Sequence, residues 1–424
     1  MPSTADRKAE NNWYWSIPKV ELHCHLEGSI RFSRLINEYV RQGIALPTDD
    51  VPAQRDFFLI ETPVPDLSAF VDKFDHIHKI FADLSVLEAI TEEVIEDKFN
   101  EGVVMFEMRW APSYISGSFE YDFNDILRYI QRGVAKGRAK CDNKIEVGMI
   151  CIAVGALGAE QFKKTADFCI ANKDAFIAFD IAGNEVNAGQ YKEYMDQLHA
   201  AGVNITVHAA EDRVAGKPEN AIIAVEDLHA TRIGHGIQTE KDPAAFKTIL
   251  DRDIHLELCP SSNYVTNSVD SVADHPIRRF FDLGANISLN TDDPGLMAVD
   301  LPHEYKLLHE LPSLHFTPAE FKDMNLKAIE ASFMPKHIKD KVRDTWFSHK
   351  DPLGIAVPLP DLQPAKQVAA AAVAAAVATA AAPAAQPSVQ QKKERKTRIA
   401  EDVLSPVEGM QPERKKEGRR CCCF

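Results

Sequence analysis

Three histidines and one aspartate, far apart in the chain, are of the residue types that bind a transition metal. They are His23 and His25 in a His-Cys-His segment, His208, and Asp292 in an Asn-Thr-Asp-Asp-Pro segment. Two imidazoles separated by one residue at the end of a strand can reach the same ion, because alternate side chains share a face. Nitrogen and oxygen ligands suit a borderline ion such as Zn²⁺ and leave a position for water. The ion would lower the pKa of that water, so these residues predict metal-assisted hydrolysis.

Two further residues beside this set could move protons. Glu211 follows His208 by three positions, and His235 stands between Gly234 and Gly236. Each of these segments on its own also fits a structural role, such as a surface carboxylate or an aspartate that begins a helix. The chemical interpretation therefore depends on a fold that brings them together.

The elements that would position these residues are short apolar runs rich in β-branched side chains. Eight such runs occur, at 20–25, 103–109, 145–154, 176–183, 204–211, 231–235, 255–259 and 286–293. Between most of them lie stretches with apolar residues at helical spacing, among them 124–140, 160–172, 190–201 and 243–252. Eight alternating units predict a TIM (β/α)₈ barrel, whose strand carboxyl ends meet at one mouth.

One connection of the predicted barrel is unusually long. About 75 residues separate the first two runs, and segments 66–81 and 87–100 within them have helical patterns. A helical insertion after the first strand is a candidate lid over the mouth. We predict an N-terminal extension at 1–16, the barrel at 17–358, and a disordered, low-complexity Ala/Pro-rich tail with a basic end at 359–424.

Charge and cysteine content limit the possible partners and compartment. The formal net charge is −15, which disfavours nucleic acid as a partner and suits a small neutral or cationic substrate. The eight cysteines form no CxxC pair, as expected in a reducing compartment. The first thirty residues lack the apolar run of a secretory leader, so we predict a cytoplasmic protein.

Five segments of this chain resemble the adenosine deaminase family in order and spacing. They are PKVELHCHLEG (18–28), TVHAAE (206–211), RIGHG (232–236), LCPSSN (258–263) and SLNTDDP (288–294). The resemblance runs from about Ile17 to about Phe347. It implies a (β/α)₈ barrel with one catalytic zinc ion. The implied reaction is the hydrolysis of the 6-amino group of a purine to a 6-oxo group, with release of ammonia, in purine salvage.

The resemblance also implies a role for each site residue. Glu211 would protonate ring N1 while hydroxide attacks C6, and His235 would orient and deprotonate the attacking water. Asp293 would hydrogen-bond N7, and the backbone N–H of Gly183 would meet N3. Glu27, near the ribose, and His25 would border the substrate.

Two positions depart from the family pattern. Glu27 stands where adenosine-specific members usually have Asp, and Ala210 stands where Gly is common. Glu at the first position also occurs in relatives that act on adenine or on modified nucleosides. The segments EMRWAP (107–112) and NTDD (290–293) resemble the adenosine branch.

The expected substrates are therefore adenosine and 2′-deoxyadenosine. One alternative is an adenine or modified aminonucleoside deaminase. A second is a phosphoester or amide hydrolase, for which a second metal and a bridging ligand would be needed. A third is a catalytically silent barrel that serves as a binding or signalling protein.

The carboxyl terminus carries a separate prediction. The chain ends Cys-Cys-Cys-Phe, with Cys421 fourth from the end and basic residues just before it, the outline of a prenylation site. The two middle positions are cysteine instead of aliphatic residues, so an unmodified tail is the alternative. One lipid and a basic segment are together sufficient for membrane association.

In cells that prenylate proteins, we expect the full chain to partition into membranes and Cys421→Ser to stay in the soluble fraction. The reason is that only a cysteine at this position can accept the lipid. Fractionation followed by immunoblotting measures the distribution. Equal soluble fractions for the two proteins would contradict the prediction.

Overall fold

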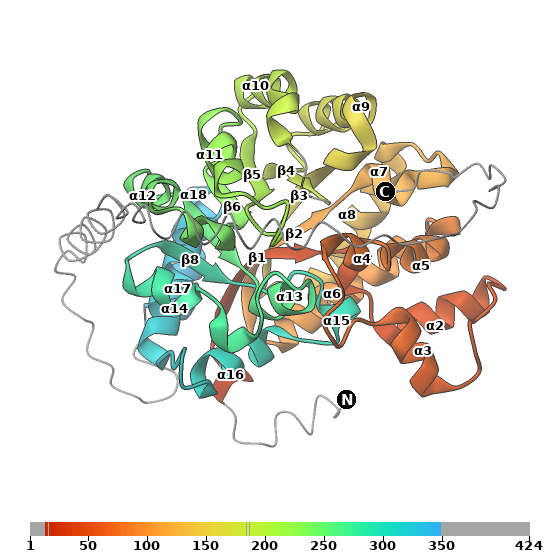
Figure 1. Cartoon of the computed structure of the whole chain (residues 1–424). Helices are drawn as coiled ribbons and strands as arrows, with labels where there is room; N and C mark the ends of the chain where they lie inside the picture. The colour runs from red at the N-terminus through yellow and green to blue at the C-terminus, as the bar shows by residue number, and fades with distance from the viewer. Residues whose placement is uncertain (1–12, 16, 184, 186, 349–424) are drawn as a thin grey trace, which may run out of the picture.

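The computed structural model describes residues 13–15, 17–183, 185 and 187–348, and its centre is a barrel of eight parallel strands (Figure 1). The strands are β1 (Lys19–His25), β2 (Val103–Trp110), β3 (Glu146–Val154), β4 (Ala178–Ala182), β5 (Asn204–Ala209), β6 (Arg232–His235), β7 (His255–Leu258) and β8 (Asn286–Leu289). Each strand pairs with the next in chain order. The predicted TIM barrel is confirmed, and all eight predicted runs contain a strand.

The strands are buried on both faces, as expected when helices cover the outside of a parallel barrel. All eight residues of β2 are buried, and β6 and β7 have no exposed residue. The covering helices include α8 (Phe123–Lys140), α9 (Gly158–Ala171), α10 (Lys192–Ala200), α11 (Pro218–Glu226), α12 (Pro243–Asp251), α14 (Ile277–Asp282) and α17 (Pro318–Ala331). The local sequence sets several of their starts: Pro occupies the first turn of α11, α12 and α17, where no backbone N–H is needed.

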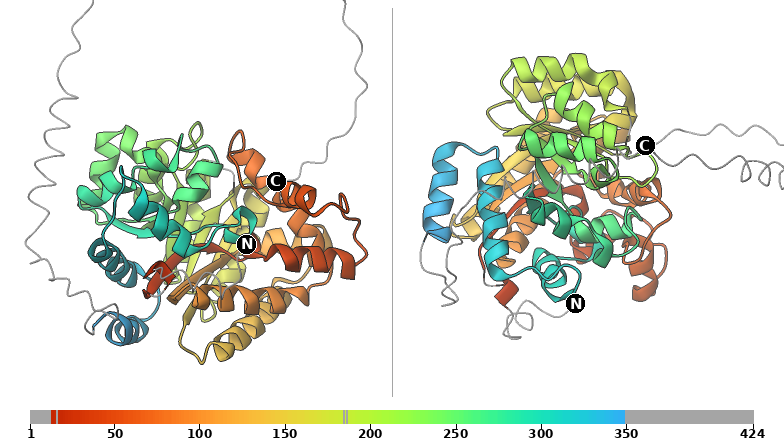
Figure 2. Two further views of the ribbon diagram at one scale, coloured as in Figure 1. Left: turned by 90° about the horizontal axis from the view of Figure 1, so that it is seen from below. Right: turned by 60° about the vertical axis from the view of Figure 1, so that its left-hand side comes forward.

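The insertion after β1 is helical, as predicted, and it lies to one side of the barrel (Figure 2). It contains α2 (Phe32–Arg41), α3 (Val51–Phe58), α4 (Leu67–Val71), α5 (Phe74–His78), the 3₁₀ turn Lys79–Ala82 and α6 (Val86–Asn100). The pattern of segment 66–81 suggested one helix, but the structure divides it into α4, α5 and the 3₁₀ turn. Its helical hydrogen bonding breaks at Asp72 and Lys73, whose ψ angles of −24° and −25° are those of a 3₁₀ turn. Lys73 Nζ donates to the Phe57 carbonyl and so ties this break to the end of α3.

The barrel closes between β1 and β8 through few backbone contacts. His25 N–H donates to the Asp292 carbonyl at 2.8 Å, and Asp292 N–H donates to the His23 carbonyl at 3.1 Å. Farther from the mouth, side chains take over: Leu22 N–H donates to Asn290 Oδ1, and Thr291 N–H donates to Glu21 Oε1, both at 2.9 Å. A register shift in the β1–β2 pairing also lies between Glu21 and Cys24. The seam therefore places the backbones of both predicted histidine ligands of β1 beside the predicted aspartate ligand.

The ends of the chain are only partly described. Trp13–Trp15 of the predicted N-terminal extension form a 3₁₀ turn, and the Trp13 ring packs against His309 and Phe321. The other residues of the predicted extension, 1–12 and 16, lie outside the described residues. The predicted boundary at 358, the tail at 359–424 and Cys421 also lie outside them. Among the described helices, none combines the length and apolar character needed to cross a bilayer.

Candidate metal centre and substrate pocket

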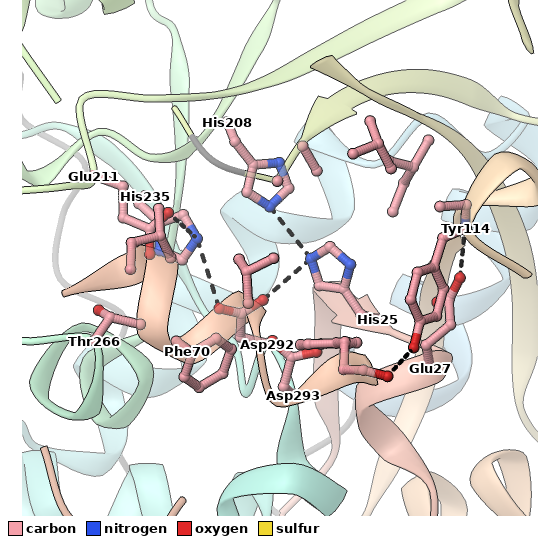
Figure 3. A pocket seen from close by; sticks show the side chains of 18 residues that line it. His25, Glu27, Phe70, Tyr114, His208, Glu211, His235, Thr266, Asp292 and Asp293 are labelled. Atoms are coloured by element: carbon pink, nitrogen blue, oxygen red, sulfur yellow. Dashed lines mark hydrogen bonds and ion pairs between the residues drawn. The ribbon is translucent and has the colours of Figure 1, made fainter. Parts of the chain in front are cut away.

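The polar residues singled out in the sequence meet at the carboxyl ends of the strands, and Figure 3 shows them apart from His23. His23 and His25 come from β1, His208 from β5 and His235 from β6. Asp292 follows β8 within three residues. The fold thus brings all four proposed ligands and His235 into one cluster.

The distances within the cluster fit a four-coordinate metal. Nε2 of His23 and Nε2 of His25 each lie 3.2 Å from Asp292 Oδ1. His25 Nε2 lies 3.3 Å from His208 Nε2. Ligand bonds of 2.0–2.1 Å to zinc at tetrahedral angles correspond to ligand separations of about 3.3 Å. The three separations among these donor atoms therefore match edges of one coordination tetrahedron.

Hydrogen bonds behind two of the imidazoles leave Nε2 with a free lone pair. His23 Nδ1 lies 2.7 Å from Glu257 Oε2, and His208 Nδ1 lies 3.1 Å from Asp180 Oδ1. Burial raises the pKa of both carboxyls, but for Glu257 it is outweighed by Arg109 and Arg232, and for Asp180 by His208 and Arg109, so each pKa falls below its ordinary value. An ionised carboxylate only accepts, so each Nδ1 carries the proton.

One ring nitrogen of this cluster is left without a hydrogen bond. His23 Nε2 is buried without a hydrogen-bond partner and faces a carboxylate oxygen of Asp292. Facing lone pairs repel each other unless a cation lies between them. The residues present therefore fit a divalent ion by their own chemistry.

His235 is also close enough to be considered as a ligand. One atom each of His23, His208, His235 and Asp292 lies within 4.8 Å of the others. His235 Nε2 is 3.7 Å from Asp292 Oδ2 and 3.6 Å from Glu211 Oε2. Distances alone thus leave His25 and His235 as alternatives for the third imidazole.

A pocket opens beside the cluster and is bounded on one side by the insertion (Figure 3). Its apolar wall contains Leu67, Phe70, Val71, Phe74, Ala111, Tyr114, Ile152, Val154 and Ala182. The predicted substrate-binding residues Glu27, Gly183, Asp293 and His25 also line it, as do Glu211 and His235. The helices α4 and α5 therefore occupy the position expected for a lid, because they supply much of the apolar wall.

The surroundings of two carboxyls in this pocket favour their neutral form. Burial, then the charges of Asp292, Glu185 and Asp212, raises the pKa of Glu211 well above its ordinary value. Burial and the charge of Asp292 likewise raise the pKa of Asp293. A raised pKa favours the neutral carboxyl, and a neutral carboxyl can donate a hydrogen bond.

Glu27 and Gly28 shape the pocket beside these acids. Burial raises the pKa of Glu27 to about 7, and its Oε1 accepts the Ala111 N–H at 2.7 Å. A Cβ atom at Gly28 would lie 1.7 Å from Asp293 Oδ1, so only glycine allows this approach. That oxygen is buried without a hydrogen-bond partner.

Three residues of the site have left-handed backbone conformations. Their φ angles are +54° at Ala210, +64° at His235 and +66° at Asp292. L-residues other than glycine rarely adopt such angles, and surrounding contacts must hold them there. This geometry accounts for the preference of the family for Gly at position 210.

Glu185, which the sequence did not single out, holds the loop that contains Glu211. Its carboxylate accepts the N–H groups of Ala210 at 2.6 Å, Glu211 at 3.1 Å and Asp212 at 3.2 Å, and the amide of Asn220 at 2.7 Å. These bonds fix the acid by its backbone. Glu185 lies two residues after the fourth predicted run, and nothing in the sequence signals this role.

A layer of buried charges lies beneath the cluster of proposed ligands. The sequence did not single out these residues either. Glu257 accepts Arg109 Nη2 and Arg232 Nε, each at 2.6 Å, in addition to its contact with His23. Arg109 Nη1 donates to Asp180 at 2.8 Å. Charged residues within otherwise apolar strands were the available signal, because such residues are rarely buried unless paired.

The chain is similar to known proteins over this same region. A family model described as adenosine deaminase matches residues 18–347. The adenosine deaminase of Plasmodium falciparum is 34% identical over 345 residues, which cover 81% of this chain and 93% of the relative. A solved N6-mAMP deaminase of Arabidopsis has a TM-score of 0.70 at 26% identity, covering 80% of this chain and 99% of that one. An amidohydrolase from Burkholderia ambifaria with bound Zn also has a TM-score of 0.70, at 23% identity, covering 88% and 96%; this likeness concerns the fold alone.

Glu257→Gln tests the buried charge layer. We expect the free energy of unfolding to fall by about 3–5 kcal/mol, because two buried arginines lose their shared carboxylate. Metal affinity should fall about 10–100-fold, since His23 loses the partner that orients it. Urea unfolding and metal titration measure the two effects.

Glu226→Gln is the matched control for this variant. Glu226 pairs with Arg252 at 2.9 Å, but both side chains are about half exposed. Removing its charge should cost less than about 1 kcal/mol. If the two variants were equally stable, the buried layer would not have the role given to it.

Proposed function

The chain belongs to the adenosine deaminase family, and we propose that it converts adenosine and 2′-deoxyadenosine to the 6-oxo nucleosides, releasing ammonia, in purine salvage. It is a hydrolase of C–N bonds in cyclic amidines. The observation that carries the choice of an aminopurine is the pair of buried carboxyls with raised pKa values, Glu211 and Asp293, in a pocket beside the cluster of proposed ligands.

We propose that His23, His25, His208 and Asp292 hold one zinc ion per chain. The spacing of their donor atoms and the unpartnered His23 Nε2 support this assignment. When bound, zinc lowers the pKa of water and so makes a nucleophile available near neutral pH. The protein then has to bind, orient and protonate the purine.

The adenine ring offers three nitrogen acceptors, N1, N3 and N7, and the pocket offers three donors. These donors are the Glu211 acid, the Gly183 N–H and the Asp293 acid, all of which line the pocket. An ionised carboxylate at either acid position would repel the ring nitrogen lone pair. The raised pKa values therefore match the purine as well as the chemistry.

Glu211 is the proton donor in the proposed reaction. As the oxygen of the attacking water forms its bond to C6, Glu211 gives its proton to N1, so that no negative charge develops on the ring. One proton of the attacking water passes to N6, so that the C6–N6 bond breaks and ammonia leaves, and the other proton of the water replaces the one that Glu211 gave up. Because the Glu185 carboxylate holds the backbone of Glu211, the acid is oriented before the substrate arrives.

The pocket favours a nucleoside over a nucleotide. No Lys or Arg occurs among the described residues that line it, whereas Glu27, Glu211, Asp292 and Asp293 are all carboxyls. A 5′-phosphate would find no cation in this part of the chain. We therefore favour adenosine over a nucleoside monophosphate, although an N6-mAMP deaminase is among the structural neighbours. Adenine and N6- or sugar-modified nucleosides remain the alternative substrates.

The cellular location is proposed from the sequence alone. We propose a cytoplasmic enzyme whose membrane association depends on lipid attached to Cys421. The described residues do not include this cysteine. The partner of the site itself is a small purine compound.

Glu211→Gln tests the proton donor. The amide cannot supply an acidic proton, so we expect kcat to fall about 10²–10⁴-fold while zinc stays bound, because Glu211 is not a proposed ligand. The loss of absorbance of the aminopurine measures turnover, and metal analysis of the same preparation measures zinc. His208→Ala is the contrasting variant, which should lose zinc together with activity. Full turnover by Glu211→Gln would overturn the assignment.

A substrate panel tests the sugar and the phosphate. We expect kcat/KM for adenosine to exceed that for AMP by at least about 100-fold, because the described residues that line the pocket include no Lys or Arg that could pair with a desolvated phosphate. Adenine and 2′-deoxyadenosine complete the panel. Equal rates on AMP and adenosine would contradict the nucleoside assignment, and no turnover of any aminopurine would favour a silent binding protein.

A further inference from the structure

We propose that Asn263 and His275 are positioning residues that hold His235 with its proton on Nε2, so that His235 acts as a hydrogen-bond donor in the site and not as a proton acceptor. Asn263 lies in α13 (Pro260–Val265), and His275 follows the 3₁₀ turn Val272–Asp274. Neither residue lines the substrate pocket. The inference rests on the deaminase function proposed above and deepens it by assigning the chemical state of one residue.

The argument begins at a backbone amide, whose direction of donation is fixed. The N–H of Ile277 donates to His275 Nδ1 at 3.1 Å. Because Nδ1 accepts this bond, the proton of neutral His275 is on Nε2. His275 is only 3% exposed, and burial lowers its pKa to about 3, so the ring is neutral.

The side-chain amide of Asn263 fixes the direction of the next two hydrogen bonds. His275 Nε2 lies 3.1 Å from one amide atom of Asn263, which must be the oxygen because Nε2 is a donor. The other amide atom is therefore the NH₂ group, and it lies 3.1 Å from His235 Nδ1. His235 Nδ1 must then accept, which leaves the proton of the neutral ring on Nε2.

No other arrangement of protons satisfies all four residues. A proton on His235 Nδ1 would point at the N–H of Asn263. Rotating the amide by 180° would remove that conflict but would set its NH₂ group against the N–H of His275. All three side chains are at most 3% exposed, so water cannot repair a broken link. The backbone of Ile277 thus determines the state of a ring three hydrogen bonds away.

The resulting Nε2–H group points into the reacting space. It lies 3.6 Å from Glu211 Oε2 and 3.7 Å from Asp292 Oδ2, between the acid that serves N1 and the metal cluster. A donor fixed here orients the attacking oxygen and stabilises the negative charge that develops on it. A protonated Nε2 has no lone pair for a metal, which leaves His25 as the third imidazole ligand. The deprotonation of water by His235, expected from the family resemblance, is not compatible with this state.

Asn263→Asp tests the proposal with almost no change of shape. A carboxylate accepts from both sides, so His235 would place its proton on Nδ1 and expose a lone pair at Nε2. We expect kcat on adenosine, in zinc-loaded enzyme at about pH 8 where a histidine of ordinary pKa is neutral, to fall on the order of 100-fold with little change in KM. If His235 acted as a base, the same substitution would maintain or increase kcat, and that result would overturn the proposal.

Nitrogen NMR of ¹⁵N-histidine-labelled zinc enzyme reads the protonation state directly. The Nε2 of His235 should be the protonated nitrogen in the unaltered chain, and Nδ1 should be protonated in Asn263→Asp, with the resonances assigned from His235→Gln. Protonation of Nδ1 in the unaltered chain would overturn the proposal without any variant. This measurement does not depend on turnover, so an enzyme inactive on adenosine would refute the proposed function and still test the relay.

Two further variants separate positioning from stability. Asn325→Asp places a carboxylate at another buried asparagine, which accepts the Val20 N–H at 2.7 Å far from the pocket. It should lower stability as Asn263→Asp does but keep kcat. His275→Phe releases one end of the amide, so both tautomers of His235 should appear and kcat should fall less than in Asn263→Asp. A kcat for Asn325→Asp as low as that of Asn263→Asp would reduce the relay to a structural role and overturn the proposal.

Discussion

The rest of the site depends on the interactions of one group, the Glu257 carboxylate. It is fully buried, and it is shared by Arg109 and Arg232 beneath the site and by His23 within it. Without the arginines, a buried carboxylate would be protonated and could not hold the imidazole by its Nδ1–H. Without the carboxylate, two guanidinium groups would lie unpaired in the barrel. One charge balance therefore fixes both the packing of the strands and the direction of a proposed metal ligand.

The partner behind each histidine determines what that histidine can do. Carboxylates stand behind His23 and His208, so their protons lie on Nδ1 and their Nε2 atoms can bind a cation. An amide stands behind His235 and is itself directed by His275, so the proton of His235 lies on Nε2. Similar imidazoles a few ångströms apart thus have opposite roles, and the difference lies in residues that never contact the substrate.

Much of the architecture could be predicted from the sequence because it repeats. Eight apolar runs, each ending in polar residues, predict the barrel and the place where His23, His208 and Asp292 meet. The break of segment 66–81 could not be predicted, since it depends on Lys73 reaching the Phe57 carbonyl. The imidazole and guanidinium partners of Glu257 come from three different strands and become neighbours only when the barrel closes. Asn263 and His275 belong to ordinary loop chemistry until their partners are known.

The seam between β1 and β8 has a consequence for folding. Its backbone contacts are few, and Asp292 at its mouth carries a charge that the neighbouring imidazoles cannot neutralise while their Nε2 atoms are unprotonated. A divalent ion there would act as a clasp, joining the first strand to the last and both to β5. Since such an ion binds the closed barrel and not the unfolded chain, its binding energy adds to the stability of the closed form. The centre that prepares a nucleophile would then also stabilise the closed barrel.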